Sequence, residues 1–218
     1  YPQRTAILDK GLLNPAHKAV VINMPTSSGK TLLAEFRILQ ALNQFSEING
    51  WIAYVAPTRA LVNQISRRLK KDLEPIGVKV EKMSGALEVD LFEENLVSNH
   101  NEGKVFDILV TTPEKLNLLI RNELEKEVKD SLVLTVIDEA HNLEDNSRGL
   151  NYELLMANIK NDCSKSNFLL LTPFIKNSGE IASWLDPDSP QDISIGISWK
   201  PNDRIIGAIH PEGRARKW

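Results

Sequence analysis

The sequence predicts an α/β domain with a mostly parallel, twisted sheet and helices on both faces. Short, continuous apolar runs recur along the chain, and helix-length stretches separate most of them. Strands buried on both faces read as continuous apolar runs, and the intervening helices allow right-handed crossovers between parallel strands. The runs are AVVIN from 19, WIAYV from 51, VKV from 78, FDILV from 106, LVLTVI from 132, NFLLL from 167 and ISIGI from 193.

The clearest helix is predicted over residues 58–74. Its apolar residues recur at a spacing of four and would form one buried stripe, and Pro75 would end the helix. The basic segment RRLKK from 67 is more typical of a solvated helix face than of a binding patch. The apolar stripe consists of Leu61, Ile65, Leu69 and Leu73.

The composition is that of an ordinary globular domain. The chain has 218 residues, of which 42% are hydrophobic and 25% charged, which suits one domain and argues against a disordered or collagen-like chain. Lys and Arg number 26 and Asp and Glu number 29, so the net charge is -3. A nucleic-acid partner would therefore have to be bound by a local patch, since the overall charge does not attract it.

The single cysteine, Cys163, excludes an internal disulfide and a multi-cysteine metal site and is typical of a reducing compartment. The sequence has no run of 18 apolar residues and no charged-then-apolar leader. We therefore expect no membrane span, no secretory signal and an intracellular, by default cytoplasmic, location. Because the chain begins at Tyr1 without a methionine and ends on GRARKW, we expect it to be part of a longer protein.

Polar motifs follow five of the apolar runs directly. In an open parallel sheet, ligands bind beyond the carboxyl ends of the strands, so we expect these motifs to meet at one edge. They are MPTSSGKT, APTRALVNQ, TTPEKL, DEAH and TPF.

MPTSSGKT, from 24 to 31, has the features of a phosphate-binding loop that leads into a helix. Gly29 allows close approach of the backbone, Lys30 can reach the β and γ phosphates, and the Thr31 hydroxyl can ligate magnesium. The helix N-terminus adds unpaired amide donors and the positive end of a dipole. Met24 stands where the strict pattern has its first glycine, and the alternative is a capped helix start.

DEAH places adjacent carboxylates, Asp138 and Glu139, at the end of a buried strand. In phosphoryl transfer, an aspartate in this position holds magnesium, and a neighbouring group orients or deprotonates the attacking water. Alone, Asp138 would more simply cap a following helix. The presence of Lys30 and Thr31 on an earlier strand end of the same sheet favours the catalytic interpretation.

The motifs, in their order and spacing, resemble those of the first RecA-like domain of a superfamily 2 helicase with an Asp-Glu-Ala-His box. Tyr1-Pro2-Gln3 resembles the upstream segment whose glutamine reads adenine. MPTSSGKT resembles motif I, PTRALVNQ motif Ia, TTPEKL motif Ib and DEAH motif II. The stretches most similar to the Ski-like branch are PTSSGKTLLAEF, MSGALEVD from 83, RG at 148 and 149, and IASWL with SWKPNDR near the end.

The resemblance implies a RecA-like P-loop NTPase domain over residues 1–200, followed over 201–218 by the start of a linker to a second RecA-like domain that this chain lacks. It implies ATP and Mg²⁺ as cofactors. Thr31 and Asp138 would hold Mg²⁺, and Glu139 would activate water. His141 would connect hydrolysis to motif III or to the second domain, the alternative being an ordinary histidine at a helix start. ATP would be bound by Gln3, Thr26, Ser27, Ser28, Gly29, Lys30 and Thr31.

The resemblance also implies sequence-independent contacts to the backbone of DNA or RNA. Thr58 and Thr112 could equally be helix caps, with Pro113 in a first helical turn, and both roles are compatible. The residues implied in nucleic-acid binding are Pro57, Thr58, Arg59, Ser84, Gly85, Thr111, Thr112, Pro113 and Glu114.

One motif departs from the family. Where Ser-Ala-Thr is usual, this chain has Thr172-Pro173-Phe174, which keeps one hydroxyl for coupling and stiffens the backbone. The leading hypothesis is the first motor domain of an ATP-driven helicase or translocase. A nucleotide-gated clamp or scaffold without unwinding is the main alternative, favoured by the altered motif. A metabolic kinase would leave PTRALVNQ, TTPEKL and DEAH unexplained.

Overall fold

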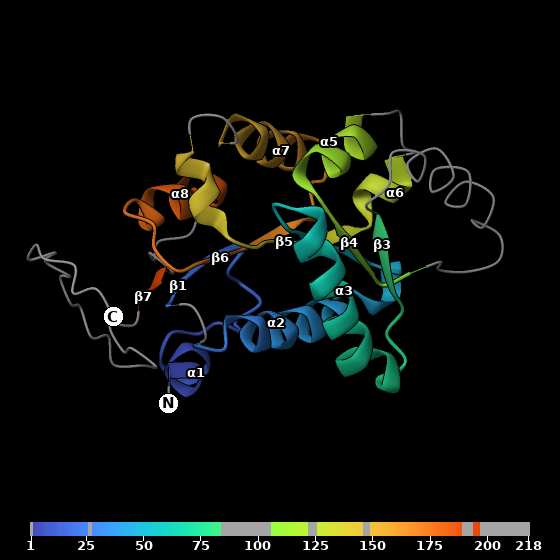
Figure 1. Cartoon of the computed structure of the whole chain (residues 1–218), viewed down its shortest axis with the longest axis horizontal. Helices are drawn as coiled ribbons and strands as arrows, with labels where there is room; N and C mark the ends of the chain where they lie inside the picture. Colours follow the sequence, from blue (N-terminus) through green and yellow to red (C-terminus); the bar gives the residue numbers. More distant parts are fainter. Residues whose placement is uncertain are drawn as a thin grey trace, which may run out of the picture.

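The computed structural model describes residues 2–25, 28–83, 106–121, 126–145, 149–188 and 194–196. These residues form a seven-stranded sheet in the order β3-β4-β2-β5-β6-β1-β7, and the strand pairs are parallel (Figure 1). The predicted α/β class is confirmed. The strands are β1 (Ala19–Asn23), β2 (Trp51–Val55), β3 (Val80–Met83), β4 (Ile108–Thr111), β5 (Leu132–Ile137), β6 (Asn167–Thr172) and β7 (Ser194–Gly196).

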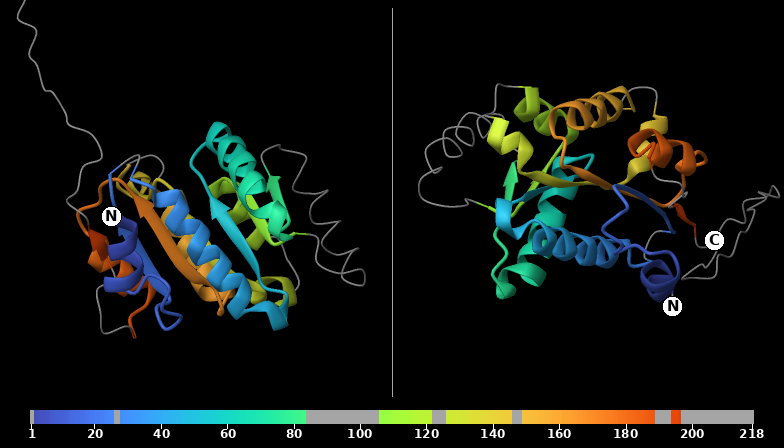
Figure 2. Two further views of the ribbon diagram at one scale, coloured as in Figure 1. Left: turned by 90° about the horizontal axis from the view of Figure 1, so that it is seen from below. Right: turned by 180° about the vertical axis from the view of Figure 1, so that it is seen from behind.

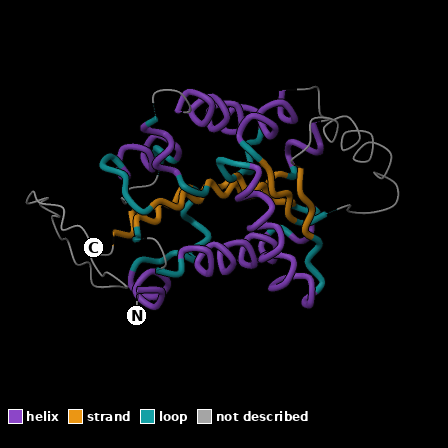
Figure 3. The backbone as a smooth tube through the Cα atoms, in the orientation of Figure 1, coloured by secondary structure: helices purple, strands orange, loops and turns teal. Residues whose placement is uncertain are grey.

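Helices form a layer on each side of the sheet (Figure 3). The layer with α1, α2 and α3 lies opposite the layer with α5, α7 and α8, and the view from behind shows the same separation (Figure 2, right). The α-helices are α1 (Pro2–Arg4), α2 (Lys30–Gln44), α3 (Arg59–Leu73), α5 (Pro113–Arg121), α6 (Lys126–Asp130), α7 (Gly149–Asp162) and α8 (Ser178–Leu185). Shorter helical turns are η1 (Thr5–Asp9), η2 (Ser46–Ile48), η3 (Glu74–Ile76) and η4 (Ala140–Glu144).

The strands β1 to β6 each supply side chains to two hydrophobic cores. On β1, Val20 and Ile22 join the core under α2 and α3, whereas Ala19 and Val21 join the core under α5, α7 and α8. Alternate residues of a strand point to opposite faces, so a strand covered on both sides must be apolar throughout. This requirement is the physical cause of the continuous apolar runs in the sequence.

The predicted helix over 58–74 is confirmed as α3. Thr58 caps its N-terminus, because the Leu61 amide donates to the Thr58 hydroxyl oxygen at 3.3 Å. The buried stripe is wider than a four-residue spacing, since Val62 and Ser66 are buried beside Ile65, Leu69 and Leu73.

Basic side chains on the outer side of α3 form ion pairs with nearby carboxylates. Arg68 contacts Glu35 of α2 at 3.0 Å, and Lys70 lies 3.9 Å from Glu74 and 3.8 Å from Glu81. The exposed pairs of Lys70 agree with the interpretation of RRLKK as a solvated helix face, whereas Arg68 reaches the buried Glu35.

A buried arginine joins α2 to the segment before β1. The Arg37 guanidinium donates to the carbonyl oxygens of Leu12, Asn14 and His17 at 3.2, 3.1 and 2.6 Å. Burial lowers the pKa of Arg37 to about 10, so the group remains a cation near neutral pH. Within the described part of the chain, no helix combines the length and apolar character needed to cross a membrane.

Candidate ATP-binding site

The phosphate-loop segment runs from β1 into α2. Gly29 has φ of +87°, a left-handed conformation that favours glycine, and α2 begins at the next residue. A Cβ on Gly29 would lie 2.5 Å from Gln3 Nε2, so any larger residue would also displace the Gln3 side chain. The predicted phosphate contacts of Thr26 and Ser27 lie outside the described residues.

Gln3 contacts this loop directly. Its Nε2 donates to the Ser28 carbonyl at 2.6 Å, and the Ser28 hydroxyl donates to the Pro25 carbonyl at 2.5 Å. The structure therefore brings the predicted adenine-reading residue against the predicted phosphate loop, although the two are 25 residues apart in sequence.

Lys30 folds back over the loop. Its Nζ donates to the Met24 carbonyl at 3.0 Å, at the position where the strict motif has a glycine. Burial lowers the pKa of Lys30, while the negative charges of Glu139 and Asp138 act to raise it. The strand order explains this influence, because β1 and β5 flank β6 and end at the same edge.

Asp138 follows β5 and has donors on both of its carboxyl oxygens. The Glu139 amide donates to Oδ1 at 2.9 Å, and the Tyr54 hydroxyl donates to Oδ2 at 3.2 Å. Burial raises the pKa of Asp138, and the hydrogen bonds from Glu139 and Tyr54 oppose that shift. Asp138 does not cap a regular helix, since the short turn η4 begins at Ala140 with Glu139 in the cap position.

Glu139 has an unusual backbone conformation. Its φ and ψ are 52° and 46°, a left-handed region that few residues other than glycine adopt. The Asn142 amide and side chain both donate to the Glu139 carbonyl, at 3.0 and 2.7 Å. In the side chain of Glu139, Oε2 lies 3.3 Å from His141 Nδ1. The two hydrogen bonds from Asn142 hold the Glu139 backbone in this conformation, and backbone conformations of this kind cluster at functional sites.

The side chains at this edge suit magnesium. Among the described residues no group of three or more His, Cys, Asp or Glu could hold a metal by itself. Mg²⁺ usually binds one or two carboxylates and completes its shell with water and substrate phosphates. The Asp138 carboxylate and the Thr31 hydroxyl are hard oxygen ligands of the required kind.

The predicted nucleic-acid contacts occupy the ends of β2 and β4. Arg59 and Glu114 are exposed, and Thr58 is half-buried as the cap of α3. Thr111 is fully buried, and its hydroxyl donates to the Met83 carbonyl at 3.1 Å, so this side chain supports the strand end. Thr112 and Pro113 are buried at the start of α5. Ser84, Gly85 and the rest of MSGALEVD beyond Met83 lie outside the described residues.

The altered third motif forms a closed local turn. The Thr172 hydroxyl donates to the Phe174 carbonyl at 3.0 Å and accepts from the Phe174 amide at 3.2 Å. Thr172 ends β6 level with Asn23 of β1. The predicted coupling residue therefore lies beside the phosphate loop, with its hydroxyl engaged within its own turn.

Two residues of the site carried no clear sequence signal. Tyr54 lies inside the apolar run WIAYV, where a tyrosine suggests core packing, and Asn142 follows DEAH without a periodic pattern. Only the contacts of Tyr54 to Asp138 and of Asn142 to Glu139 reveal them. Other predictions, a linker over 201–218 and Arg148 and SWKPNDR as family features, lie outside the described residues.

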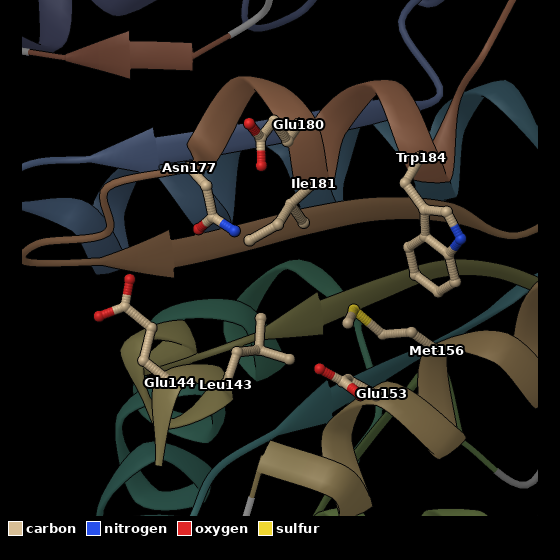
Figure 4. Close-up of a pocket in the computed structure, with 8 residues that line it drawn as sticks. All are labelled: Leu143, Glu144, Glu153, Met156, Asn177, Glu180, Ile181 and Trp184. Carbon is tan, nitrogen blue, oxygen red and sulfur yellow. The ribbon is translucent and has the colours of Figure 1, made fainter. Parts of the chain in front are cut away.

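A separate pocket of about 440 Å³ lies between η4, α7 and α8 (Figure 4). Trp184 of α8 and Met156 of α7 point toward each other across it. None of the predicted ATP-site residues is among the described residues that line it, so the candidate site rests on the strand-edge motifs. The lining residues are Leu143, Glu144, Glu153, Met156, Asn177, Glu180, Ile181 and Trp184.

Fold and strand-edge motifs together define a RecA-like ATP-binding domain. The chain belongs to the DEAD/DEAH box helicase family, whose family model matches residues 3–175. This membership confirms the family resemblance and the P-loop NTPase class that the motifs predict, and it implies the use of ATP.

Curated relatives match nearly all of the chain. The chain is 32% identical over 202 residues to the ATP-dependent DNA helicase Hel308 of Methanococcus vannielii, covering 92% of the chain and 24% of the relative. It is 30% identical over 192 residues to the Hachiman protein HamB of Bacillus cereus, covering 87% of the chain and 16% of that relative. Hel308 of Thermococcus kodakarensis is 30% identical over 213 residues, covering 96% and 16%. The chain thus spans about a quarter or less of these relatives.

Solved structures share the fold. The Pyrococcus furiosus Hef helicase domain has a TM-score of 0.62 at 20% identity, covering 88% of this chain and 39% of that one. The DUF1998 helicase MrfA bound to DNA and AMPPNP has a TM-score of 0.62 at 20% identity, covering 85% and 28%.

Proposed function

We propose that this chain is the first of two RecA-like motor domains in an ATP-driven nucleic-acid helicase or translocase. One observation carries the proposal. Lys30, after β1, and Asp138 and Glu139, after β5, stand at the same edge of the sheet, where only β6 separates β1 from β5. A phosphate-binding lysine and a pair of carboxylates at one sheet edge are the parts that ATP hydrolysis needs.

The phosphates of ATP would bind to the backbone amides of the loop and to Lys30. The Lys30 ammonium donates to the Met24 carbonyl, and as a group with three N–H donors it could contact a phosphate as well. The Thr31 hydroxyl and the Asp138 carboxylate would hold Mg²⁺, which when bound would supply positive charge against the charge that develops on the phosphates. Glu139 would accept a proton from the attacking water.

Gln3 would contact the adenine of ATP and would also hold the phosphate loop through its hydrogen bond to Ser28. Its amide already donates to the Ser28 carbonyl, so a nucleotide would either share this amide or displace it. His141 lies against Glu139, which supports a role in reporting the state of the catalytic carboxylate to other parts of the motor.

The nucleic-acid backbone would cross the carboxyl ends of β2 and β4. Exposed Arg59 and the amides at the start of α3 and α5 supply positive charge and donors there. Such contacts are independent of base sequence. The MrfA helicase, which shares this fold, binds DNA and AMPPNP in its solved structure, and this similarity supports the same two classes of ligand here.

A nucleotide-gated clamp is the second candidate. The Thr172 hydroxyl is engaged with the Phe174 backbone in its own turn, and a hydroxyl held in this way is less free to connect hydrolysis to movement. A clamp would bind nucleic acid in an ATP-dependent manner without rapid turnover.

The two candidates predict different kinetics for the parent protein. We would measure ATP hydrolysis with single-stranded DNA, duplex DNA or RNA, beside a Glu139→Gln control. A motor should be stimulated by one polymer, and the control should lose at least about 100-fold, the usual contribution of a general base. Nucleotide-dependent polymer binding without stimulated turnover would instead support the clamp, and failure to bind ATP would exclude both.

A further inference from the structure

Tyr54 places a polar group deep inside the sheet. It lies on β2, its side chain is fully buried, and its hydroxyl is 3.2 Å from Asp138 Oδ2. A buried hydroxyl is costly unless it forms a hydrogen bond, and phenylalanine would fill the same core position without that cost. The hydroxyl thus calls for an explanation beyond packing.

The chemistry of the two groups sets the direction of this hydrogen bond. A phenol, with an ordinary pKa of about 10, keeps its proton at neutral pH, and an ionised carboxylate can only accept. Tyr54 therefore donates to Asp138 Oδ2, while the Glu139 amide donates to Oδ1. With one donor on each oxygen, the plane of the carboxylate is defined, and each oxygen keeps a lone pair for a further partner.

We propose that Tyr54 is a positioning residue that holds the Asp138 carboxylate in the orientation required to bind Mg²⁺ beside the phosphates. The inference rests on the proposed function, because it assigns Asp138 to the metal. Binding Mg²⁺ in a fixed geometry is favoured when the ligand is oriented in advance, and hydrogen bonds to ligating carboxylates serve this purpose.

Tyr54→Phe removes the hydroxyl and leaves the ring. We would titrate Mg²⁺ into the 218-residue chain with a fluorescent ATP analogue and record the concentration at half-maximal Mg²⁺-dependent binding. We expect this concentration to rise roughly three- to tenfold, the effect of losing one hydrogen bond to a charged group. Affinity for the analogue without Mg²⁺ should stay within about twofold of the unsubstituted chain, because Tyr54 contacts the carboxylate and not the phosphate loop.

Tyr152→Phe is the matched control. Tyr152 is equally buried, at 1% exposure, but belongs to α7 in the other core. Its substitution should leave the Mg²⁺ requirement unchanged. An unchanged requirement in Tyr54→Phe, or an equal rise in both variants, would overturn the role of Tyr54. If the unsubstituted chain bound the analogue without any effect of Mg²⁺, the proposed function would fail first and this inference with it.

A second measurement needs no substitution at Tyr54. The chain has three tyrosines, Tyr1, Tyr54 and Tyr152, so ¹³Cζ labelling of tyrosine gives three NMR signals, which Tyr1→Phe and Tyr152→Phe assign. Adding Mg²⁺ to the ADP-bound chain should shift the Tyr54 signal and leave that of Tyr152 in place. A Tyr54 signal that does not respond, in a sample where Mg²⁺ raises ADP affinity, would overturn the proposal.

Discussion

Gly29 meets two separate constraints at the turn into α2. Its φ of +87° is strained for any residue with a Cβ, and an added Cβ would lie 2.5 Å from Gln3 Nε2. Glycine in phosphate loops is usually explained by the approach of the ligand. In this chain a protein side chain, Gln3, already occupies the space that a larger residue would need.

We expect Gly29→Ala to lower the free energy of unfolding by about 2 kcal/mol or more, since left-handed strain costs roughly 1 to 2 kcal/mol and Gln3 must also move. Gly77→Ala is a matched control. Gly77 has φ of +89°, but nothing lies within 4 Å of an added Cβ, so it reports the backbone cost alone. Urea unfolding measures both. Equal losses of unfolding free energy in Gly29→Ala and Gly77→Ala would contradict a cost from the contact with Gln3. If the extra loss in Gly29→Ala disappears when Gln3→Ala is added, the contact with Gln3 is its cause.

At the scale of elements, the sequence predicted α3 and the starts of β1, β2, β5 and β6 correctly, but it placed the starts of β3 and β4 too early. Thr58 and Pro75 bracket α3 as the sequence indicates. The third and fourth strands begin two residues later than their apolar runs, at Val80 and Ile108. The Asp107 carboxylate accepts a hydrogen bond from the Lys79 amide at 2.6 Å. This side chain links the residues just before β3 and β4, and a search for apolar runs does not detect it.

α2 depends on Arg37 for its attachment to residues 12–17. Three carbonyls accept hydrogen bonds from this buried cation, which stabilises the structure, while burial of the charge lowers its pKa to about 10 and offsets part of the gain. Each hydrogen bond to a charged group contributes about 1.5 to 3 kcal/mol. Three of them should outweigh the cost of burial.

We therefore expect Arg37→Met to lower the free energy of unfolding by about 2 kcal/mol, measured by chemical denaturation, because methionine fills the space but leaves the carbonyls without donors. Arg67→Met on the exposed face of α3 should change it by no more than about 0.5 kcal/mol. Unchanged stability in Arg37→Met would mean that the burial cost cancels all three hydrogen bonds.

At the scale of the whole molecule, the strand order assembles the site. β5 lies between β2 and β6, and β6 lies between β5 and β1, so DEAH, the phosphate loop and the third motif end beside one another. The opposite half of the edge, formed by β2 and β4, carries the candidate nucleic-acid contacts. One sheet edge thus carries the candidate sites for both ligand classes on adjacent strands.

We expect the isolated chain to bind ATP but hydrolyse it slowly, since the proposed second RecA-like domain would supply an arginine finger worth about 10³ to 10⁵ in rate. Single-turnover assays of the 218-residue chain and of the parent protein, at saturating ATP and nucleic acid, measure the difference. Turnover of the isolated chain at the rate of the parent would show that no further domain is needed for catalysis.

Local sequence alone determined the strands, the principal helix and the residue types of the site. Strands buried on both faces must be apolar throughout, and phosphate binding needs particular residues within one short loop. Both features can therefore be recognised in short stretches of sequence. Tertiary structure alone decided which distant residues meet: Gln3 with Ser28, Arg37 with the segment before β1, and Tyr54 with Asp138, 84 residues away. These contacts depend on strand order and on burial from two sides, and a buried tyrosine in an apolar run looks the same whether its hydroxyl has a catalytic partner or none.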